Sequence, residues 1–190
     1  GNLSSLDTVS TQFIDPQSIT RTASLTQANS FTVGGAGLAY PNLYCIIYNA
    51  IACSGDPNFT IHLLAELLIE MSRSTSSLAF GGKFATRFAL TRGSTSIPLN
   101  DVLAFTPTTL ATYKANGGVE VLSTFEGKSQ NYSGSAGSFA FAPLETTSMQ
   151  VTEVPPAGVF NYALWYGADH VDTRPFTKFR QYLKILETKR

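Results

Sequence analysis

The last stretch of the chain, residues 160–186, constrains the fold most, because its apolar side chains recur at every second position. Successive side chains of a strand point to opposite faces, so a period of two separates a core face from an outer face. In the final run the apolar residues Phe179, Leu183 and Ile185 fall on one set. The alternate set is basic apart from one tyrosine and contains Lys178, Arg180, Tyr182 and Lys184. The sequence predicts a closing strand with an apolar inner face and a basic outer face.

Similar runs recur along the chain between turn signals. Residues 59–71 alternate cleanly and favour a strand, whereas leucines at helical spacing and a possible helix start at Asp56–Pro57 leave a helix as the alternative. Residues 43–53 are β-branched and aromatic, which predicts a strand buried on both faces. Further strands are expected near 30–33, over 80–90, 119–125, 139–141 and 149–154, and in two runs within 160–186, with a loop over 126–138.

Polar turns join about eight such strands, and neither a repeat nor a linker interrupts them. The sequence therefore predicts an all-β fold, an eight-stranded antiparallel jelly-roll β-sandwich over residues 31–190, preceded by an extended N-terminal arm over residues 1–30. In a jelly roll the last two strands belong to opposite sheets, and the final strand lies between early strands. The polar break over residues 167–175 is then expected to cross the sandwich.

The charge balance indicates a chain that associates with partners. Thirteen basic and thirteen acidic residues give a net charge of zero, and charged residues make up 14% of the chain, below the usual ~25%. A net charge near zero favours association, although an ordinary neutral monomer remains the alternative. The balance disfavours a dedicated nucleic-acid binder, which needs clustered Lys and Arg. No apolar run reaches the ~20 residues of a membrane span, so we expect no membrane partner.

Candidate catalytic residues are few. His62 and His170 are the two histidines, and Asp169 and Asp172 could orient His170. A serine triad also needs a nucleophile, and the nearest approach to the G-x-S-x-G pattern, residues 133–137, does not match it. We therefore expect His170 to be a loop residue at a strand end and His62 to be a satisfied surface or interface residue.

Other chemistry is also disfavoured. Cys45 and Cys53 are too few for a disulfide framework and lack zinc-site spacing, so burial as small apolar residues is expected. Glu66 and Glu70 share one face of a predicted strand but stand roughly 13 Å apart, beyond the usual separation of glycosidase carboxylates. The sequence thus predicts no enzyme, no metal site and no cofactor.

Two segments resemble coat proteins of the plant picorna-like viruses (secovirids). Residues 66–90, ELLIEMSRSTSSLAFGGKFATRFAL, resemble the strand C, polar loop and strand D of comoviruses, nepoviruses and cheraviruses, and residues 160–186 resemble their closing H and I strands. The chain length is similar to that of the smallest of three coat proteins in a cheravirus-like capsid. In that family a protease cuts a polyprotein, often at Gln/Gly, and Gly1 fits the N-terminus of such a product.

The resemblance implies a structural capsid protein that assembles with sister coat proteins into an icosahedral shell around a single-stranded RNA genome, in virions assembled in the host cytoplasm. Lys178, Arg180 and Lys184 are then expected to face either the RNA or an acidic neighbouring subunit. The alternative is a lectin-like β-sandwich that binds carbohydrate through aromatic side chains. That platform would contain Tyr162, Trp165, Tyr166, Phe176 and Tyr182, for which core and interface packing is the favoured interpretation.

Overall fold

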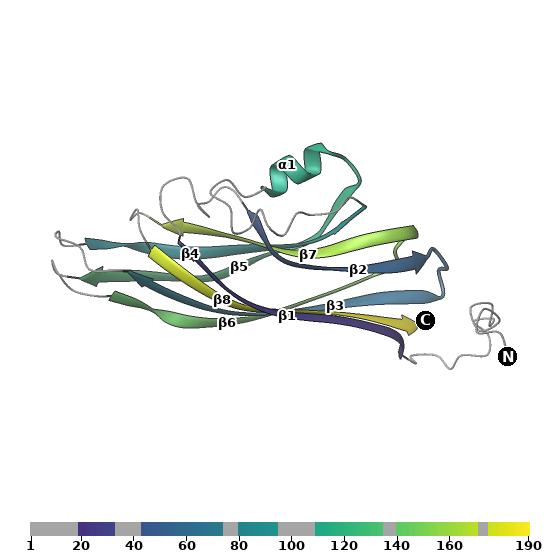
Figure 1. Ribbon diagram of the computed structural model, residues 1–190, viewed down its shortest axis with the longest axis horizontal. Helices are drawn as coiled ribbons and strands as arrows, with labels where there is room; N and C mark the ends of the chain where they lie inside the picture. Colours follow the sequence, from purple (N-terminus) through teal and green to yellow (C-terminus); the bar gives the residue numbers. More distant parts are fainter. Residues whose placement is uncertain (1–18, 33–42, 74–79, 95–108, 135–139, 171–174) are drawn as a thin grey trace.

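The computed structural model describes residues 19–32, 43–73, 80–94, 109–134, 140–170 and 175–190. These residues form eight strands that run along the long axis of the molecule in two stacked layers, with a short helix on one of them (Figure 1). The elements are β1 (Ile19–Thr32), β2 (Tyr44–Ser54), β3 (Phe59–Arg73), β4 (Phe80–Gly93), α1 (Leu110–Ala115), β5 (Val119–Gly134), β6 (Ala140–Glu153), β7 (Ala157–His170) and β8 (Pro175–Lys189).

The two layers are antiparallel sheets of four strands each. The first sheet has the order β1-β8-β3-β6 and the second has the order β2-β7-β4-β5. Every neighbouring pair within a sheet is antiparallel. This order is that of a jelly roll, so the predicted fold class is confirmed. As predicted, β7 and β8 lie in opposite sheets and β8 lies between β1 and β3.

Alternating burial confirms that residues 59–71 form a strand rather than a helix. The inward side chains of β3 are at most 1% exposed and include Ile61, Leu63, Ala65 and Leu67. In β8, Leu183 and Ile185 are fully buried in the same way. These side chains divide between two clusters. Ala65, Leu67 and Leu183 belong to a cluster that includes Leu164 and Tyr166 of the second sheet. Ile61, Leu63 and Ile185 belong to a second cluster with Phe160 and Tyr162. A period of two on both sheets thus fills the space between them with apolar side chains.

The first strand begins earlier than the sequence predicts. We expected an arm through residue 30, but β1 starts at Ile19 and pairs with β8 up to Thr32. Residues 1–18 lie outside the described part, so the division into an arm and a domain stays a prediction. Residues 66–90, which carry the first part of the resemblance, fall on β3 and β4.

The predicted strand limits around Pro143 are also wrong. The expected loop over 126–138 is in fact part of β5 as far as Gly134, paired with β4. The two short strands predicted over 139–141 and 149–154 are one strand, β6, and Pro143 does not stop it. Proline is tolerated because β6 lies at the edge of its sheet and its register with β3 shifts at this point.

The helix α1 was not predicted from the sequence. The Thr109 side chain accepts a hydrogen bond from the Thr112 backbone N–H and so caps its first turn. Six residues are too few to establish a helical period, which explains the omission. A tight turn follows at once, with positive φ angles at Gly117 and Gly118.

Candidate functional site: the outer faces of the two sheets

The outer face of the first sheet, here called the open face, has no described segment of the chain over it (Figure 1). Its described side chains alternate with the buried ones on three neighbouring strands. They are His62, Leu64, Glu66 and Leu68 of β3, Arg180, Tyr182, Lys184 and Leu186 of β8, and Thr146, Ser148, Gln150 and Thr152 of β6. The three leucines are half-buried, and the four residues of β6 are exposed. Apolar and charged groups therefore share one accessible surface.

The outer face of the second sheet, here called the covered face, is closed by the chain itself. The helix α1 lies on it, and the Tyr113 ring packs 5.4 Å from the Trp165 ring, centroid to centroid. Both side chains are at most 1% exposed. The Trp165 indole N–H donates a hydrogen bond of 2.8 Å to the Thr91 hydroxyl, so the buried donor is satisfied. Gly93 lies under Tyr113, where a Cβ atom would overlap the tyrosine hydroxyl.

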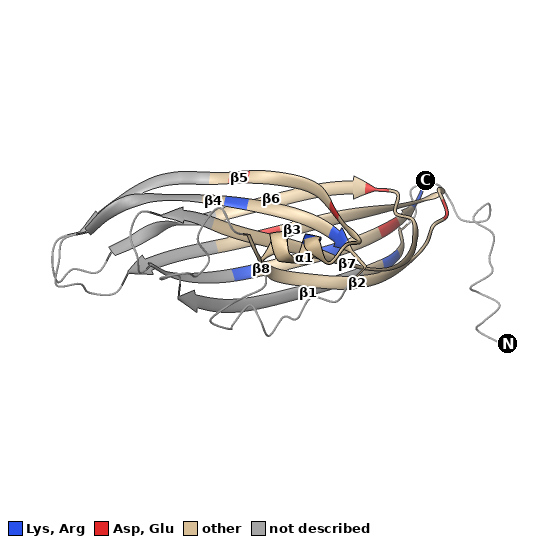
Figure 2. Ribbon diagram, turned by 90° about the horizontal axis from the view of Figure 1, so that it is seen from above, with Lys and Arg blue, Asp and Glu red and all other residues tan. Residues whose placement is uncertain are grey.

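The predicted basic residues lie on the open face, as the parity of β8 required. Arg180 is exposed and Lys184 is half-buried, and the side chain of Lys178 lies outside the described part. Sequence reasoning missed what lies beside them. In the register of β8 with β3, Lys178 is opposite Glu70 and Tyr182 is opposite Glu66. Figure 2 shows how sparsely charged residues are distributed over the described ribbon.

Two shallow depressions lie on the open face. One, of about 410 Å³, is lined in part by Glu66, Leu68, Arg180 and Tyr182 together with hydroxyl-bearing residues of β6. The other, of about 340 Å³, is lined in part by Leu64, Leu186 and Gln150. The exposed Ile19 lines the second depression. Both depressions combine apolar contact area with a few polar groups, as protein-binding surfaces commonly do.

The residues considered for chemistry are not brought together. His62 lies on the open face, where its Nε2 atom is 2.8 Å from the Thr188 hydroxyl, so it is a satisfied surface residue as expected. His170 is the last residue of β7, in the other sheet, rather than a loop residue, and its side chain lies outside the described part. Cys45 and Cys53 are both free and buried, as predicted.

The proposed aromatic platform does not exist in the form considered. Tyr162, Trp165 and Tyr166 are fully buried, so packing is their role, and Tyr182 alone of the described members is partly accessible. The described residues contain no group of three or more His, Cys, Asp or Glu that could hold a metal ion. Within the same ranges, no helix combines the length and apolar character that a membrane crossing requires.

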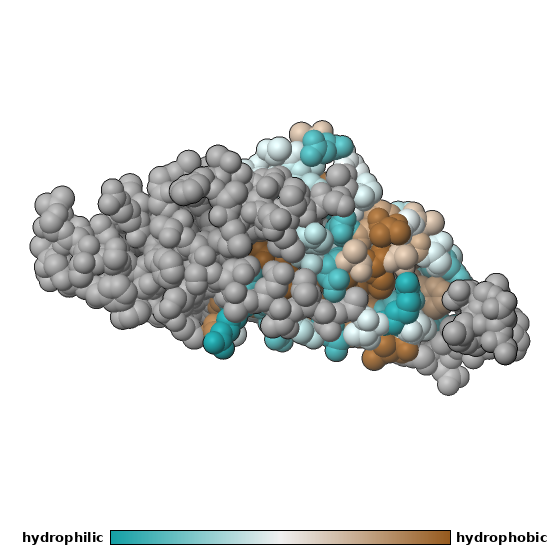
Figure 3. All heavy atoms as spheres, in the orientation of Figure 1, coloured by the Kyte–Doolittle hydropathy of each residue, from teal (hydrophilic) through white to brown (hydrophobic). Residues whose placement is uncertain are grey.

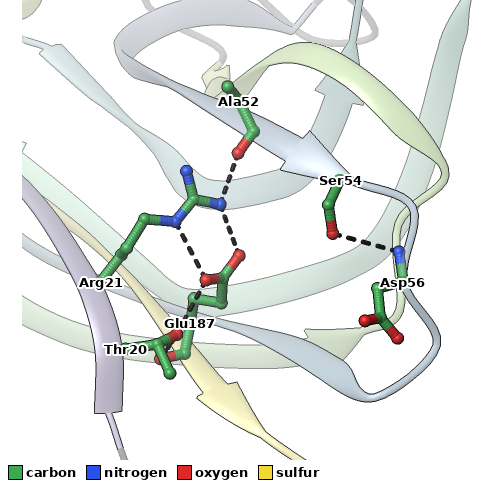
Figure 4. Close-up of polar contacts among 6 residues, drawn as sticks. All are labelled: Thr20, Arg21, Ala52, Ser54, Asp56 and Glu187. Carbon is green, nitrogen blue, oxygen red and sulfur yellow. Dashed lines mark hydrogen bonds and ion pairs between the residues drawn. The ribbon is translucent and has the colours of Figure 1, made fainter. Parts of the chain in front are cut away.

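Sequence reasoning missed two ion pairs, and the first lies near the β2–β3 turn. Arg21 of β1 binds the Glu187 carboxylate of β8 and also donates to the Ala52 carbonyl of β2 (Figure 4). Burial raises the pKa of Glu187, but hydrogen bonds from Arg21 and Thr20 and the Arg21 charge outweigh it, so the pKa lies below its ordinary value. Glu187 shares the inward parity of Leu183 and Ile185, which was the available sequence signal.

The second ion pair lies on the opposite side of the sandwich. Arg92 of β4 binds the Glu153 carboxylate of β6, and the side chains are 14% and 13% exposed. The Tyr162 hydroxyl donates a hydrogen bond of 2.6 Å to the same carboxylate. Burial, followed by this bond to Glu153, raises the pKa of Tyr162 above its ordinary value. The Arg92–Glu153 pair thus connects the two sheets directly, whereas the Arg21–Glu187 pair lies within the first sheet and reaches the second through the Arg21 bond to the Ala52 carbonyl.

Comparison with known proteins gives structural likenesses alone. The sequence matches no family model and no curated protein. The fold is similar to the structure of infectious bursal disease virus Gx strain, with a TM-score of 0.32 and 9% identity over 90% of this chain and 38% of that chain. For the 60-mer BFDV capsid protein, the TM-score is 0.26 with 11% identity over 93% of this chain and 96% of that chain. For latent PorU from Porphyromonas gingivalis, the TM-score is 0.23 with 11% identity, and the shares covered are 93% and 14%.

Likenesses at these TM-scores establish no shared function, because the viral structures and PorU, which are different kinds of protein, have similarly low TM-scores. The chain also spans 38% of the length of the first of these structures. We therefore base the functional proposal on the strand order and the open face of the chain itself.

Proposed function

We propose that this chain is a structural coat protein, a subunit of an icosahedral shell that also contains sister coat proteins and encloses a single-stranded RNA genome. The strand orders β1-β8-β3-β6 and β2-β7-β4-β5 support the proposal, since viral capsid proteins are among the proteins that have a jelly-roll fold. Lectin domains and cupins use it too, so the fold by itself does not decide the function.

The observation that carries the proposal is the open face. A sheet of a sandwich normally presents a polar outer face to water, yet here Leu64, Leu68 and Leu186 are half-buried on the outer face. Figure 3 shows a different surface, the side of the molecule that faces the viewer in Figure 1. In its described part, too, apolar and polar residues lie side by side. With zero net charge, the chain has little repulsion to oppose contact between copies. Repeated weak contacts become strong when a closed shell makes many of them.

The finer features of the proposal follow from the sequence resemblance. We propose a secovirid, cheravirus-like small subunit that is assembled into virions in the host cytoplasm. For Lys178, Arg180 and Lys184 we favour a neighbouring subunit over RNA, because Glu66 lies on the same face and Glu70 is opposite Lys178. Phosphate contacts favour clustered positive charge rather than this mixture.

Sedimentation velocity of the full chain over a range of concentrations, with negative-stain microscopy of the same samples, tests the proposal. We expect concentration-dependent association and closed particles, alone or after mixing with the other coat proteins of the same source. A dispersed monomer at high concentration that binds sugars on a glycan array would support the lectin alternative and overturn the coat-protein role.

A further inference from the structure

The open face carries three charged side chains without a partner in the described part of the chain. Glu66 and Arg180 are exposed and Lys184 is half-buried. The ion pairs between described residues join Arg21 with Glu187, Arg87 with Glu126, and Arg92 with Glu153, so none includes these three. The open face thus holds both signs of charge and leaves both available to a partner.

These side chains lie in two stripes on neighbouring strands, a basic stripe on β8 and a stripe on β3 in which Glu66 is the charged member. On β8, Tyr182 stands between Arg180 and Lys184, and on the adjacent β3, Glu66 stands between Leu64 and Leu68. The register places Tyr182 directly beside Glu66, Arg180 beside Leu68, and Lys184 beside Leu64. The basic stripe and the acidic, leucine-containing stripe therefore have the same length and the same centre.

Such a pair of stripes is self-complementary. A two-fold axis parallel to the strands and midway between β3 and β8 would bring β8 of one copy over β3 of another, as an isologous contact requires. Glu66 of each copy would then lie over Tyr182 of the other. Residues two apart on a strand are about 6.8 Å apart along it, so that carboxylate would stand between Arg180 and Lys184.

The leucines fit the same arrangement. Leu64 and Leu68 of one copy would lie over the alkyl parts of Lys184 and Arg180 of the other, which basic side chains commonly use to cover apolar surface. The depression next to Glu66, Leu68, Arg180 and Tyr182, of about 410 Å³, lies at the centre of this contact. Exposed hydroxyl side chains of β6 would form the polar rim.

We propose that the open face is a two-fold contact between two copies of this chain, in which Glu66 of each copy pairs with Arg180 and Lys184 of the other. This inference rests on the proposed structural role and names the partner of the open face. It assigns Arg180 and Lys184 to an acidic neighbour, and it makes that neighbour a second copy rather than RNA.

Charge reversal of the full chain tests the contact. By symmetry each substitution acts twice in one dimer, so we expect Glu66→Arg or Arg180→Glu to weaken dimerisation at least about tenfold, because like charges then meet. The double variant E66R/R180E re-forms the pair with its signs exchanged and should recover dimerisation to within about threefold of the original chain. Sedimentation equilibrium at low and moderate salt measures the dissociation constants, and higher salt should weaken the unsubstituted dimer.

Lys114→Glu provides the matched control, because it reverses one exposed charge on α1, away from the open face. It should leave the dissociation constant unchanged. Circular dichroism verifies the fold of each variant, and the neutral changes Glu66→Gln and Arg180→Gln serve where a reversal prevents folding. The neutral variants should each weaken the dimer by a few-fold.

The results separate this inference from the proposed function. Unchanged dimerisation in the single variants, or failure of the double variant to recover it, overturns the two-fold contact, and closed particles under those conditions leave the coat-protein role intact. Loss of RNA retention in Arg180→Glu with unchanged dimerisation assigns the face to RNA and also overturns the inference. A dimer that follows the charge pattern but never forms particles supports the contact and counts against the shell.

Discussion

The two outer faces of the sandwich differ in how their apolar surface is covered. On the covered face, Tyr113 of α1 closes over Trp165, and both side chains are at most 1% exposed. On the open face, Leu64, Leu68 and Leu186 are half-buried, and no described segment lies over them. One face is thus completed within the chain, whereas the other has the composition of a contact surface. A residue that serves folding and a residue that serves association should therefore respond differently to substitution.

The largest expected effect is on the covered face. Trp165→Ala removes a fully buried ring and its hydrogen bond to Thr91, so we expect a loss of about 3–5 kcal/mol in the free energy of unfolding. Denaturant unfolding followed by circular dichroism measures it, because Trp165 is the single tryptophan and fluorescence would be lost. Val159→Ala, at a position that is 63% exposed, is the control and should change stability by less than about 0.5 kcal/mol. Equal losses in the two variants would contradict the assignment of Trp165 to the folding core.

An intermediate effect is expected at the ion pair between Arg21 and Glu187. Glu187→Gln removes the carboxylate that binds Arg21 and Thr20, and we expect a loss of about 1.5 kcal/mol at neutral pH. The expected loss of stability is smaller than for a fully buried ion pair. The Arg21 side chain is 41% exposed, so water replaces part of the interaction.

The difference in stability between Glu187→Gln and the unsubstituted chain should depend on pH. The pKa of Glu187 is lower in the folded chain than in the unfolded chain, where it is about 4.3. The contribution of the Glu187 carboxylate to the free energy of unfolding is fully present above the pKa of the unfolded chain. It is lost as the pH falls through the pKa that Glu187 has in the folded chain. Unfolding curves between neutral pH and pH 3 should therefore converge for Glu187→Gln and the unsubstituted chain. A constant difference down to pH 3 would show that ionisation of Glu187 does not contribute.

The smallest effect on folding is expected on the open face. Leu68→Thr replaces a half-buried leucine with a residue that is well suited to strands, so the free energy of unfolding should fall by less than about 1 kcal/mol. Association, measured by sedimentation, should weaken more than folding does. A large loss of stability with unchanged association would place Leu68 in the folding core and remove the contrast between the two faces.

Much of the fold could be predicted from local patterns, and the failures have identifiable causes. Strict alternation located β3 and β8 and fixed which side chains point inward, because strand geometry imposes that period directly. The first strand was missed because residues 19–30 are mostly Thr, Ser, Asn and Gln with few apolar side chains, and their pairing with β8 depends on residues distant in the sequence. The strand expected over 139–141 ended too early because the tolerance of Pro143 within a strand depends on an edge position that only the sheet order reveals.

The candidate site also has features that the sequence could predict and features that it could not. The parity of β8 was enough to place Arg180 and Lys184 outside. That Glu66 lies beside Tyr182 could not be deduced, because the predicted jelly roll placed the final strand between early strands without specifying the register that sets residues opposite each other. The ion pairs were out of reach for the same reason, because Arg21 and Glu187 are separated by 166 positions in the sequence.

By itself, the sequence determined a period-two, nearly neutral, all-β chain and the inward or outward direction of most strand residues, because side-chain alternation is a property of the local backbone. The tertiary structure alone decided which strands are neighbours, which face α1 covers and which charges stand side by side. Those features depend on contacts between residues distant in the chain. A period of two specifies the face on which a side chain lies but not the strand beside it.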